Sequence, residues 1–227
     1  MTQESASSTA ARSGPDVVGI ALYAPPPLAW KSYVALDDLT VVLGPNGAGK
    51  STIVDLVLGR RIPGSVFVNA DLIAAKRWPQ DPAGHAYEAA EIAAATRSAL
   101  IAAGQPFIAA TVFSHPSKID LVREAQAAGY TVVLHVVLVT EDLAVERVAH
   151  RVRAGGHDVP EDKVRERFRR LWELVAQAAD LADSTTFYDN SRLDGPRIVA
   201  NLSGGQIVGH HTWPDRAPTA LRSRWPT

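Results

Sequence analysis

Short apolar runs alternate with longer amphipathic or alanine-rich segments along this chain. Apolar, β-branched runs predict buried strands, and apolar residues three or four positions apart predict helices. The expected strands are residues 39–43, 66–68, 107–111, 130–139, 197–202 and 206–210. The expected helices are 53–58, 85–103 and 117–128, followed by one that begins at 141 and a long one that begins after 160. Strands that alternate with helices predict a three-layer α/β fold, with a mostly parallel sheet and helices on both faces.

Local signals place several helix ends. Gly104 and Gly129 follow two of the expected helices, where glycine is a common C-terminal cap because it accepts a left-handed backbone. Thr140 is an expected N-cap, and the acidic residues after it suit the positive end of the helix dipole. A Gly-Gly pair at 155–156 separates that helix from the last long one.

The segment between the first strand and the first helix matches the phosphate-binding pattern G-x-x-x-x-G-K-[ST] at every fixed position. Its glycines let backbone N–H groups and the helix N-terminus face anionic oxygens. Lys50 can then reach the β- and γ-phosphates, and Ser51 can ligate Mg²⁺. The expected nucleotide-binding residues are Gly44, Pro45, Asn46, Gly47, Ala48, Gly49, Lys50, Ser51 and Thr52. A plain glycine turn is the alternative, but the strand–loop–helix context favours a nucleoside triphosphate site.

The composition is that of an ordinary globular enzyme. The 227 residues are 46% hydrophobic with a formal net charge of −1, which leaves no overall basic excess for nucleic acid or an anionic membrane. The absence of cysteine excludes disulfides, thiolate metal sites and cysteine nucleophiles. We expect a disordered leader at 1–16, one main domain at 17–213 and an irregular tail at 214–227. No apolar run approaches the roughly 18 residues of a membrane span, so we expect a cytoplasmic protein.

Residues 202–206 read Leu-Ser-Gly-Gly-Gln, which is the signature of ABC transporter ATPases. In that family the signature opens a helix, and an apolar strand with acidic catalytic residues follows closely. Here the next residues are Ile-Val-Gly-His-His-Thr-Trp-Pro, so we prefer a hairpin turn at Ser-Gly-Gly. The two interpretations differ in one testable respect, because only the first requires a helix to begin at 202–206.

Several segments together resemble the zeta-toxin family of P-loop kinases. The matching pieces are residues 44–52, 69–74, 111–118, 147–153, 155–161 and 189–191, and they extend over roughly residues 38–200. The resemblance implies a helical lid and Mg²⁺-dependent transfer of a phosphoryl group from ATP to a small-molecule hydroxyl. In the best-known members the acceptor is UDP-N-acetylglucosamine. Any neutralising antitoxin is expected to be a separate chain.

Asp71 follows the second expected strand, at the edge where ligands meet an open α/β sheet. A carboxylate there can accept the proton of an attacking hydroxyl, and the resemblance places the family's proposed base at this position. The alternative is that Asp71 caps the helix that follows. We expect Asn69 to be a structural hydrogen-bonding residue rather than a substrate contact.

Arginines gather on the last two long helices. Arg147 and Arg151 lie four positions apart and share a helix face, and so do Arg165 and Arg169. Guanidinium groups suit the spread negative charge of a phosphoryl-transfer transition state, and we expect Arg151 and Arg167 to serve there. The Gly-Gly break would let the two helices act as a lid. The alternative is a solvated face on which the arginines pair with neighbouring glutamates.

One position departs from the family. The stand-alone branch ordinarily reads Glu-Thr where this chain reads Ala110-Thr111. The family glutamate is taken to hold or orient the substrate, whereas an alanine side chain accepts no hydrogen bond and carries no charge. A crippled enzyme, a rearranged site and an engineered substitution all fit this change. The expected acceptor-binding residues are Asp71, Ala110, Thr111 and His157, and a loop-fixing role is the alternative for His157.

The sequence therefore predicts an ATP-dependent kinase that phosphorylates a hydroxyl of a sugar nucleotide such as UDP-N-acetylglucosamine. Its expected catalytic residues are Asp71, Lys50, Arg151 and Arg167. The alternatives are an ABC-type ATPase and a catalytically silent ATP-binding module, and Ala110 favours the silent module. A kinase acting on nucleic-acid ends is disfavoured, because the sequence has no basic groove interleaved with aromatic residues.

Overall fold

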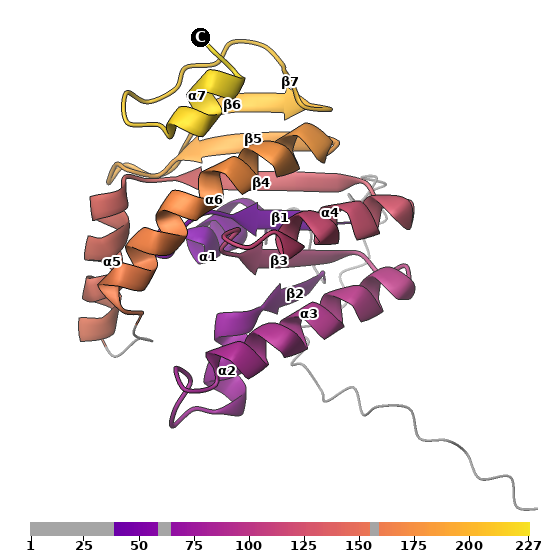
Figure 1. Ribbon diagram of the computed structural model, residues 1–227, viewed down its shortest axis with the longest axis vertical. Coiled ribbons are helices and arrows are strands. Elements are labelled where there is room, and N and C mark those ends of the chain that lie inside the picture. The colour runs from indigo at the N-terminus through magenta and orange to yellow at the C-terminus, as the bar shows by residue number, and fades with distance from the viewer. Residues whose placement is uncertain (1–38, 59–64, 155–158) are drawn as a thin grey trace, which may run out of the picture.

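The protein has a three-layer α/β fold, as the sequence predicts. The computed structural model describes residues 39–58, 65–154 and 159–227. One seven-stranded sheet, in the order β2-β3-β1-β4-β5-β6-β7, lies between helices on both faces (Figure 1). The expected leader at 1–16 and the Gly-Gly break at 155–156 lie outside the described residues.

The elements follow one another in an alternating order. The strands are β1 (Leu39–Leu43), β2 (Val66–Asn69), β3 (Phe107–Thr111), β4 (Val132–Leu138), β5 (Ser184–Asp189), β6 (Arg197–Ser203) and β7 (Gln206–Ile207). The helices are α1 (Lys50–Ile53), which continues into the π-helical turn η1 (Val54–Leu58), α2 (Ala70–Arg77), α3 (Ala86–Ala102), α4 (Ser117–Ala127), α5 (Glu141–Arg153), α6 (Glu161–Leu181) and α7 (Thr219–Arg224).

The central strand β1 is buried on both faces. It pairs in parallel with β3 and β4, and all five of its residues are buried, including the polar Thr40. Side chains alternate along a strand, so Val41 faces a core formed with α3, α4 and α6, while Val42 faces a second core formed with α1 and α5. Strands β1 to β5 are all parallel, so their carboxyl ends lie at one edge of the sheet. The phosphate loop begins at this edge, directly after β1.

The expected helix ends are confirmed. Gly104 and Gly129 have φ values of 62° and 86°, and each follows a helix. The Thr140 side chain accepts a hydrogen bond of 3.3 Å from Leu143 N, which caps α5.

Strand β5 and helix α7 are additional to the sequence prediction. The β5 sequence Ser-Thr-Thr-Phe-Tyr-Asp is too polar to read as a buried apolar run. The sequence predicts an irregular tail at 214–227, but the tail contains α7 and packs on the sheet. Trp225 donates from Nε1 to Gly205 O at 2.9 Å, and its ring centroid lies 5.8 Å from that of Phe187. These contacts, which join distant segments, are what order the tail.

The hairpin interpretation of residues 202–206 is confirmed. β6 and β7 are antiparallel, with Ser203 opposite Gln206, and the two glycines between them have φ values of 52° and 75°. No helix begins at 202–206, so the ABC-type alternative is wrong. The last strand is also shorter than expected, since β7 ends at Ile207 and Gly209, at φ 75°, turns the chain away.

Among the described residues, no helix combines the length and the apolar character needed to cross a membrane.

Candidate functional site

The phosphate loop is held in place by close backbone approaches. A Cβ atom on Gly47 would lie 2.5 Å from the carbonyl oxygen of Ala144 in α5. A Cβ on Gly49 would lie 2.5 Å from Nδ2 of Asn190, just after β5. Both glycines also have positive φ values, of 75° and 89°. Only glycine meets both demands at these positions, so the loop sequence is dictated by its neighbours as well as by its own turn.

Lys50 lies within this loop. Its Nζ donates to the carbonyl oxygens of Gly44 at 3.0 Å and Pro45 at 2.9 Å. Burial lowers the pKa of Lys50 to about 8; the negative charge of Asp71 opposes this shift and the positive charge of Arg151 adds to it. Two expected catalytic residues therefore lie close enough to Lys50 to affect its charge.

Asn69, rather than Asp71, caps helix α2. The Asn69 side-chain oxygen accepts hydrogen bonds from Asp71 N at 2.8 Å and Leu72 N at 3.3 Å. The structural role expected for Asn69 is confirmed, and the alternative role of Asp71 as the cap is wrong. The Asp71 carboxylate makes no hydrogen bond among the described residues and lines the cavity beside the phosphate loop. It is thus available to a ligand.

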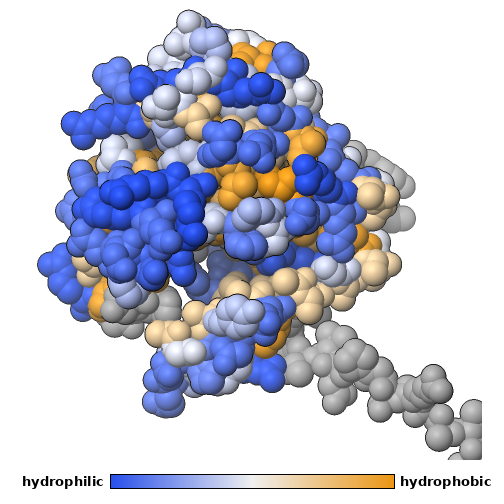
Figure 2. All heavy atoms as spheres, viewed as in Figure 1, coloured by the Kyte–Doolittle hydropathy of each residue, from blue (hydrophilic) through white to orange (hydrophobic). Residues whose placement is uncertain are grey.

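This cavity has a volume of about 420 Å³ and opens between the α2–α3 region and the α5–α6 region, where Figure 2 shows a hollow. The residues that line it include polar ones from four separate parts of the chain: Asn46, Lys50, Asn69, Asp71, Thr111, Ser114, Lys118, Lys163 and Arg167. Small side chains form much of the rest: Ala70, Ala83, Ala86, Ala90 and Ala110. The expected residues Lys50, Asp71, Ala110, Thr111 and Arg167 thus share one cavity.

Positive charge dominates the cavity. Four cations, Lys50, Lys118, Lys163 and Arg167, line it together with a single carboxylate, Asp71, and of the four only Lys163 forms an ion pair among the described residues, with Glu166 at 3.3 Å. Burial, and then the nearby charge of Arg97, lower the pKa of Lys118, which makes no ion pair among the described residues. The sequence alone gives no role to Lys118, although this residue ends the matching segment 111–118. The cavity is therefore suited to an anionic ligand.

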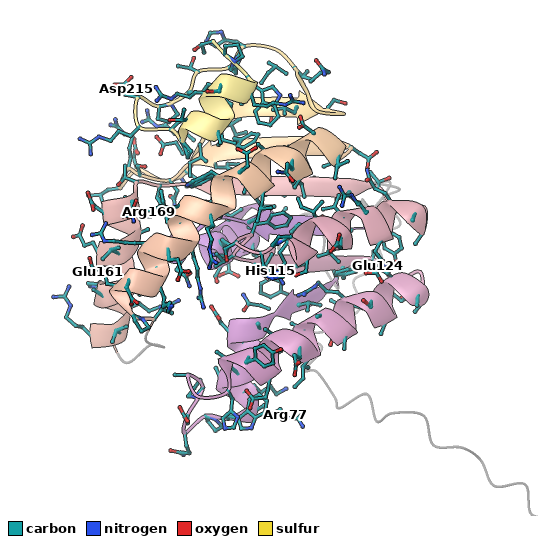
Figure 3. All side chains as sticks on the ribbon, in the orientation of Figure 1. Arg77, His115, Glu124, Glu161, Arg169 and Asp215 are labelled. Carbon is teal, nitrogen blue, oxygen red and sulfur yellow. The ribbon has the colours of Figure 1, made fainter. Side chains whose placement is uncertain are left out.

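The arginines of α5 and α6 divide into two groups. Arg165 forms ion pairs with Glu161 at 2.8 Å, Asp142 at 3.0 Å and Glu141 at 3.2 Å, and hydrogen bonds to these three carboxylates raise its pKa. Arg169 also pairs with Glu141, at 3.1 Å, and Figure 3 labels Arg169 and Glu161 on the α5–α6 side of the molecule.

Arg165 and Arg169 therefore belong to a solvated face on which arginines pair with neighbouring acidic residues, which is the alternative named for the arginine cluster. Arg167 makes no ion pair among the described residues and faces the cavity instead, and Arg151 is close enough to Lys50 to lower its pKa.

Ala110 lies at the end of β3, opposite Asn69 of β2 in the sheet register. It is only 6% exposed, and it lines the cavity next to Thr111. A longer side chain at this position would thus point to the same space as Lys50 and Asp71. The remaining acceptor-site candidate, His157, lies outside the described residues.

The turn between α2 and α3 forms one rim of the cavity. There the Trp78 ring stacks on His85 with centroids 4.5 Å apart, and the Arg77 guanidinium lies 5.3 Å from the Trp78 ring centre. Ala83 and Ala86, on either side of His85, line the cavity.

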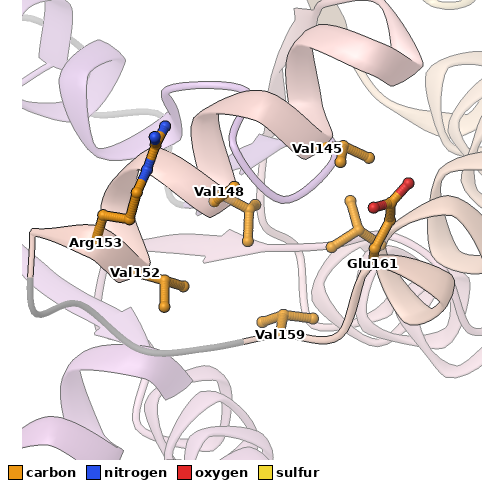
Figure 4. Close-up of a pocket in the computed structure, with 8 residues that line it drawn as sticks. Val145, Val148, Val152, Arg153, Val159 and Glu161 are labelled. Atoms are coloured by element: carbon orange, nitrogen blue, oxygen red, sulfur yellow. The ribbon is translucent and has the colours of Figure 1, made fainter.

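A second hollow, of about 530 Å³, lies between α5 and the start of α6 (Figure 4). Valines form most of its wall, and it contains no residue of the phosphate loop. Among the described residues, no cluster of three or more His, Cys, Asp or Glu side chains could hold a metal ion. The first cavity is therefore the candidate active site.

Comparison with known proteins agrees with this geometry. A family model described as "AAA domain" matches residues 39–174. No curated protein matches the sequence significantly.

Among solved structures, the AvrRxo1-ORF1:AvrRxo1-ORF2 complex with sulphate ions matches with a TM-score of 0.59 and 17% identity, over 75% of this chain and 60% of that one. The same complex with ATP gives 0.58 and 15%, over 75% and 59%. A chain of the PezAT toxin-antitoxin system of Streptococcus pneumoniae gives 0.56 and 13%, over 73% and 72%.

At these identities the likeness establishes a shared fold. One of these structures belongs to a toxin-antitoxin system, and the shared fold agrees with the resemblance noted from the sequence. This chain spans about 60% of the length of the first of these structures.

Proposed function

We propose that this chain, which belongs to the AAA domain family, transfers the γ-phosphoryl group of ATP to a hydroxyl of a small-molecule acceptor. One observation carries the proposal: Lys50 of the phosphate loop and the Asp71 carboxylate line the same cavity, together with Arg167. A phosphate-binding lysine and an available carboxylate in one space are the parts that hydroxyl phosphorylation needs.

Each residue has a definite part in the proposed reaction. Lys50 holds the β- and γ-phosphates. Asp71 takes the proton of the acceptor hydroxyl while the hydroxyl oxygen forms a bond to the γ-phosphorus. The bond from that phosphorus to the β–γ bridging oxygen breaks, and ADP leaves. Arg151 and Arg167 neutralise the charge that spreads over the transferred group.

Mg²⁺ fits this site. Ser51 is an exposed residue on the first turn of α1, and Mg²⁺ commonly takes one or two protein ligands together with phosphate oxygens and water. When bound, the ion would neutralise phosphate charge. Ser51 is the residue that would hold it.

The acceptor we propose is a sugar nucleotide such as UDP-N-acetylglucosamine. The resemblance to zeta toxins implies it, and the excess of cations over Asp71 in the cavity suits its diphosphate. The buried side-chain oxygen of Asn46 has no hydrogen-bond partner among the described residues, and a hydroxyl-bearing ligand could supply one.

A catalytically silent ATP-binding module is the second candidate, and Ala110 favours it. At the end of β3 a glutamate would place a carboxylate among Lys50, Asp71 and the acceptor, whereas alanine leaves the acceptor without that hydrogen-bond partner. A positioning carboxylate of this kind contributes about 100-fold to a rate.

A metabolite screen with labelled ATP would separate the two candidates. We expect this chain to phosphorylate the acceptor slowly and Ala110→Glu to do so about 100-fold faster, with ATP affinity unchanged. Equal rates for both proteins would mean that the site does not need the glutamate. No labelled product from either protein would favour the silent module.

Asp71→Asn, made in the faster of these two forms, tests the proposed base. The amide keeps the shape of the side chain but cannot take a proton, so turnover should fall about 100-fold or more while the ATP dissociation constant stays within about twofold. Undiminished turnover would place the base elsewhere.

We further propose a separate antitoxin-like chain as partner, acting in the cytoplasm. The support is that PezAT is a toxin-antitoxin system and that AvrRxo1-ORF1 was crystallised with AvrRxo1-ORF2. Co-expression with the neighbouring open reading frame, followed by co-purification, would test this.

A further inference from the structure

The loop that follows β5 touches the phosphate loop through one buried side chain. Nδ2 of Asn190 donates a hydrogen bond of 2.8 Å to the carbonyl oxygen of Ala48, a residue 142 positions earlier in the chain. Asn190 is only 9% exposed. A buried hydrogen bond between segments so far apart in sequence fixes their relative position, because losing one partner leaves the other buried and unsatisfied.

Asn190 is itself firmly held. Its backbone N–H donates to Leu138 O at the end of β4, at 2.9 Å. The next residue, Ser191, donates from its backbone N to the Asp189 carboxylate at 3.0 Å. The Asn190 amide thus projects from the rigid carboxyl edge of the sheet rather than from a free loop.

The direction of the Ala48 carbonyl sets the direction of the Gly49 N–H, because both belong to the same peptide group. In a planar trans peptide the C=O and the following N–H point in opposite directions. A carbonyl directed at Asn190 therefore directs the Gly49 N–H away from it, and the N–H groups of such loops are the donors that cradle phosphates. Gly49 also has to lack a Cβ for this contact, since that atom would lie 2.5 Å from Nδ2 of Asn190.

We infer that Asn190 is a positioning residue, which holds the Ala48–Gly49 peptide of the phosphate loop in the orientation that binds the triphosphate. This inference rests on the nucleotide binding of the proposed function but not on the phosphoryl transfer or on the acceptor. It also gives a physical reason for an amide at position 190, because an amide nitrogen donates to a carbonyl and a carboxylate cannot.

The test measures binding of Mg²⁺-ATP and of inorganic tripolyphosphate by calorimetry. The variants are Asn190→Ala, which removes the donor, and Asn190→Asp, which keeps the shape but sets a carboxylate against the Ala48 carbonyl. Asn201→Ala is the matched control, because the exposed Asn201 amide accepts a hydrogen bond from Thr186 on the sheet, away from the loop.

We expect Asn190→Ala to weaken the binding of both ligands about tenfold and Asn190→Asp to weaken it further. The affinities of the control variant should stay within about twofold of those of the unaltered protein. Because tripolyphosphate has no base or sugar, equal losses for the two ligands place the effect at the phosphates. The melting temperature of each unliganded variant shows whether it is folded, and Asn190→Asp preserves the packing if Asn190→Ala does not fold.

Unchanged affinities in folded Asn190 variants would overturn the inference, and so would an equal loss in the Asn201 control. Failure of the unaltered protein to bind either ligand would instead contradict the proposed function.

Discussion

The phosphate loop and helix α6 both bring positive charge to the cavity, but the sequence determines their geometry in different ways. The loop is a contiguous segment, and Lys50 is held by the carbonyl oxygens of residues five and six positions before it. The arginines of α5 and α6 have similar spacing and chemistry, yet Arg165 is paired with three carboxylates while Arg167 faces the cavity. Lys50 finds its hydrogen-bond acceptors within its own motif, whereas the role of a helical arginine depends on which acidic residues other elements bring to it.

The largest effect should come from the loop. Lys50→Ala removes the ammonium that neutralises the β- and γ-phosphates, so ATP affinity should fall about 100-fold or more in calorimetry with Mg²⁺. Lys76→Ala, an exposed lysine at the end of α2, is the matched control and should bind normally. Similar affinities for both variants would contradict the phosphate-loop assignment.

The helix pair provides the next comparison. Arg167→Ala should lower kcat about 100-fold with little change in ATP affinity, because its charge is proposed to act on the transition state. Arg165→Ala, two positions away, should reduce kcat only a few-fold and slightly lower the melting temperature, since its ion pairs with Glu141 and Asp142 join α6 to α5 at the surface. If the two variants lose the same activity, the division of the arginines into two groups is wrong.

A smaller effect should appear with pH. Burial lowers the pKa of Lys50 to about 8, so the lysine is charged in the free protein below pH 8 and becomes neutral above it. Phosphate binding requires the charged form, so above pH 8 the protein must take up a proton to bind ATP. Affinity should then weaken with pH by at most about tenfold per unit. The Lys50→Ala variant is the control, and a flat profile in the unaltered protein would contradict the lowered pKa.

Local patterns predicted much of the fold. The apolar run 39–43 and the glycine-rich loop after it lie as expected, because a buried strand and a phosphate loop can each be recognised from a short contiguous segment. Asn69 was likewise expected to be structural. These features need little information from the rest of the chain.

What could not be predicted depends on distant partners. The polar strand β5 is fixed by pairing with β4 and β6, and α7 is ordered by contacts of Trp225 with Gly205 and Phe187. The same holds within the site. Nothing near Lys118 in the sequence indicates that it will share a cavity with residues of α2 and α6, and the sequence around Asn190 does not reveal a contact with Ala48.

The stack of Trp78 on His85 gives the protein an intrinsic optical reporter. Trp172, Trp213 and Trp225 are buried in the core. Trp78 instead lies at the turn between α2 and α3, beside the alanines that line the cavity. An indole ring in such a place changes its emission when the neighbouring imidazole or guanidinium moves. The difference in emission between the unaltered protein and Trp78→Phe would therefore report, without a label, movement of this turn at the rim of the cavity.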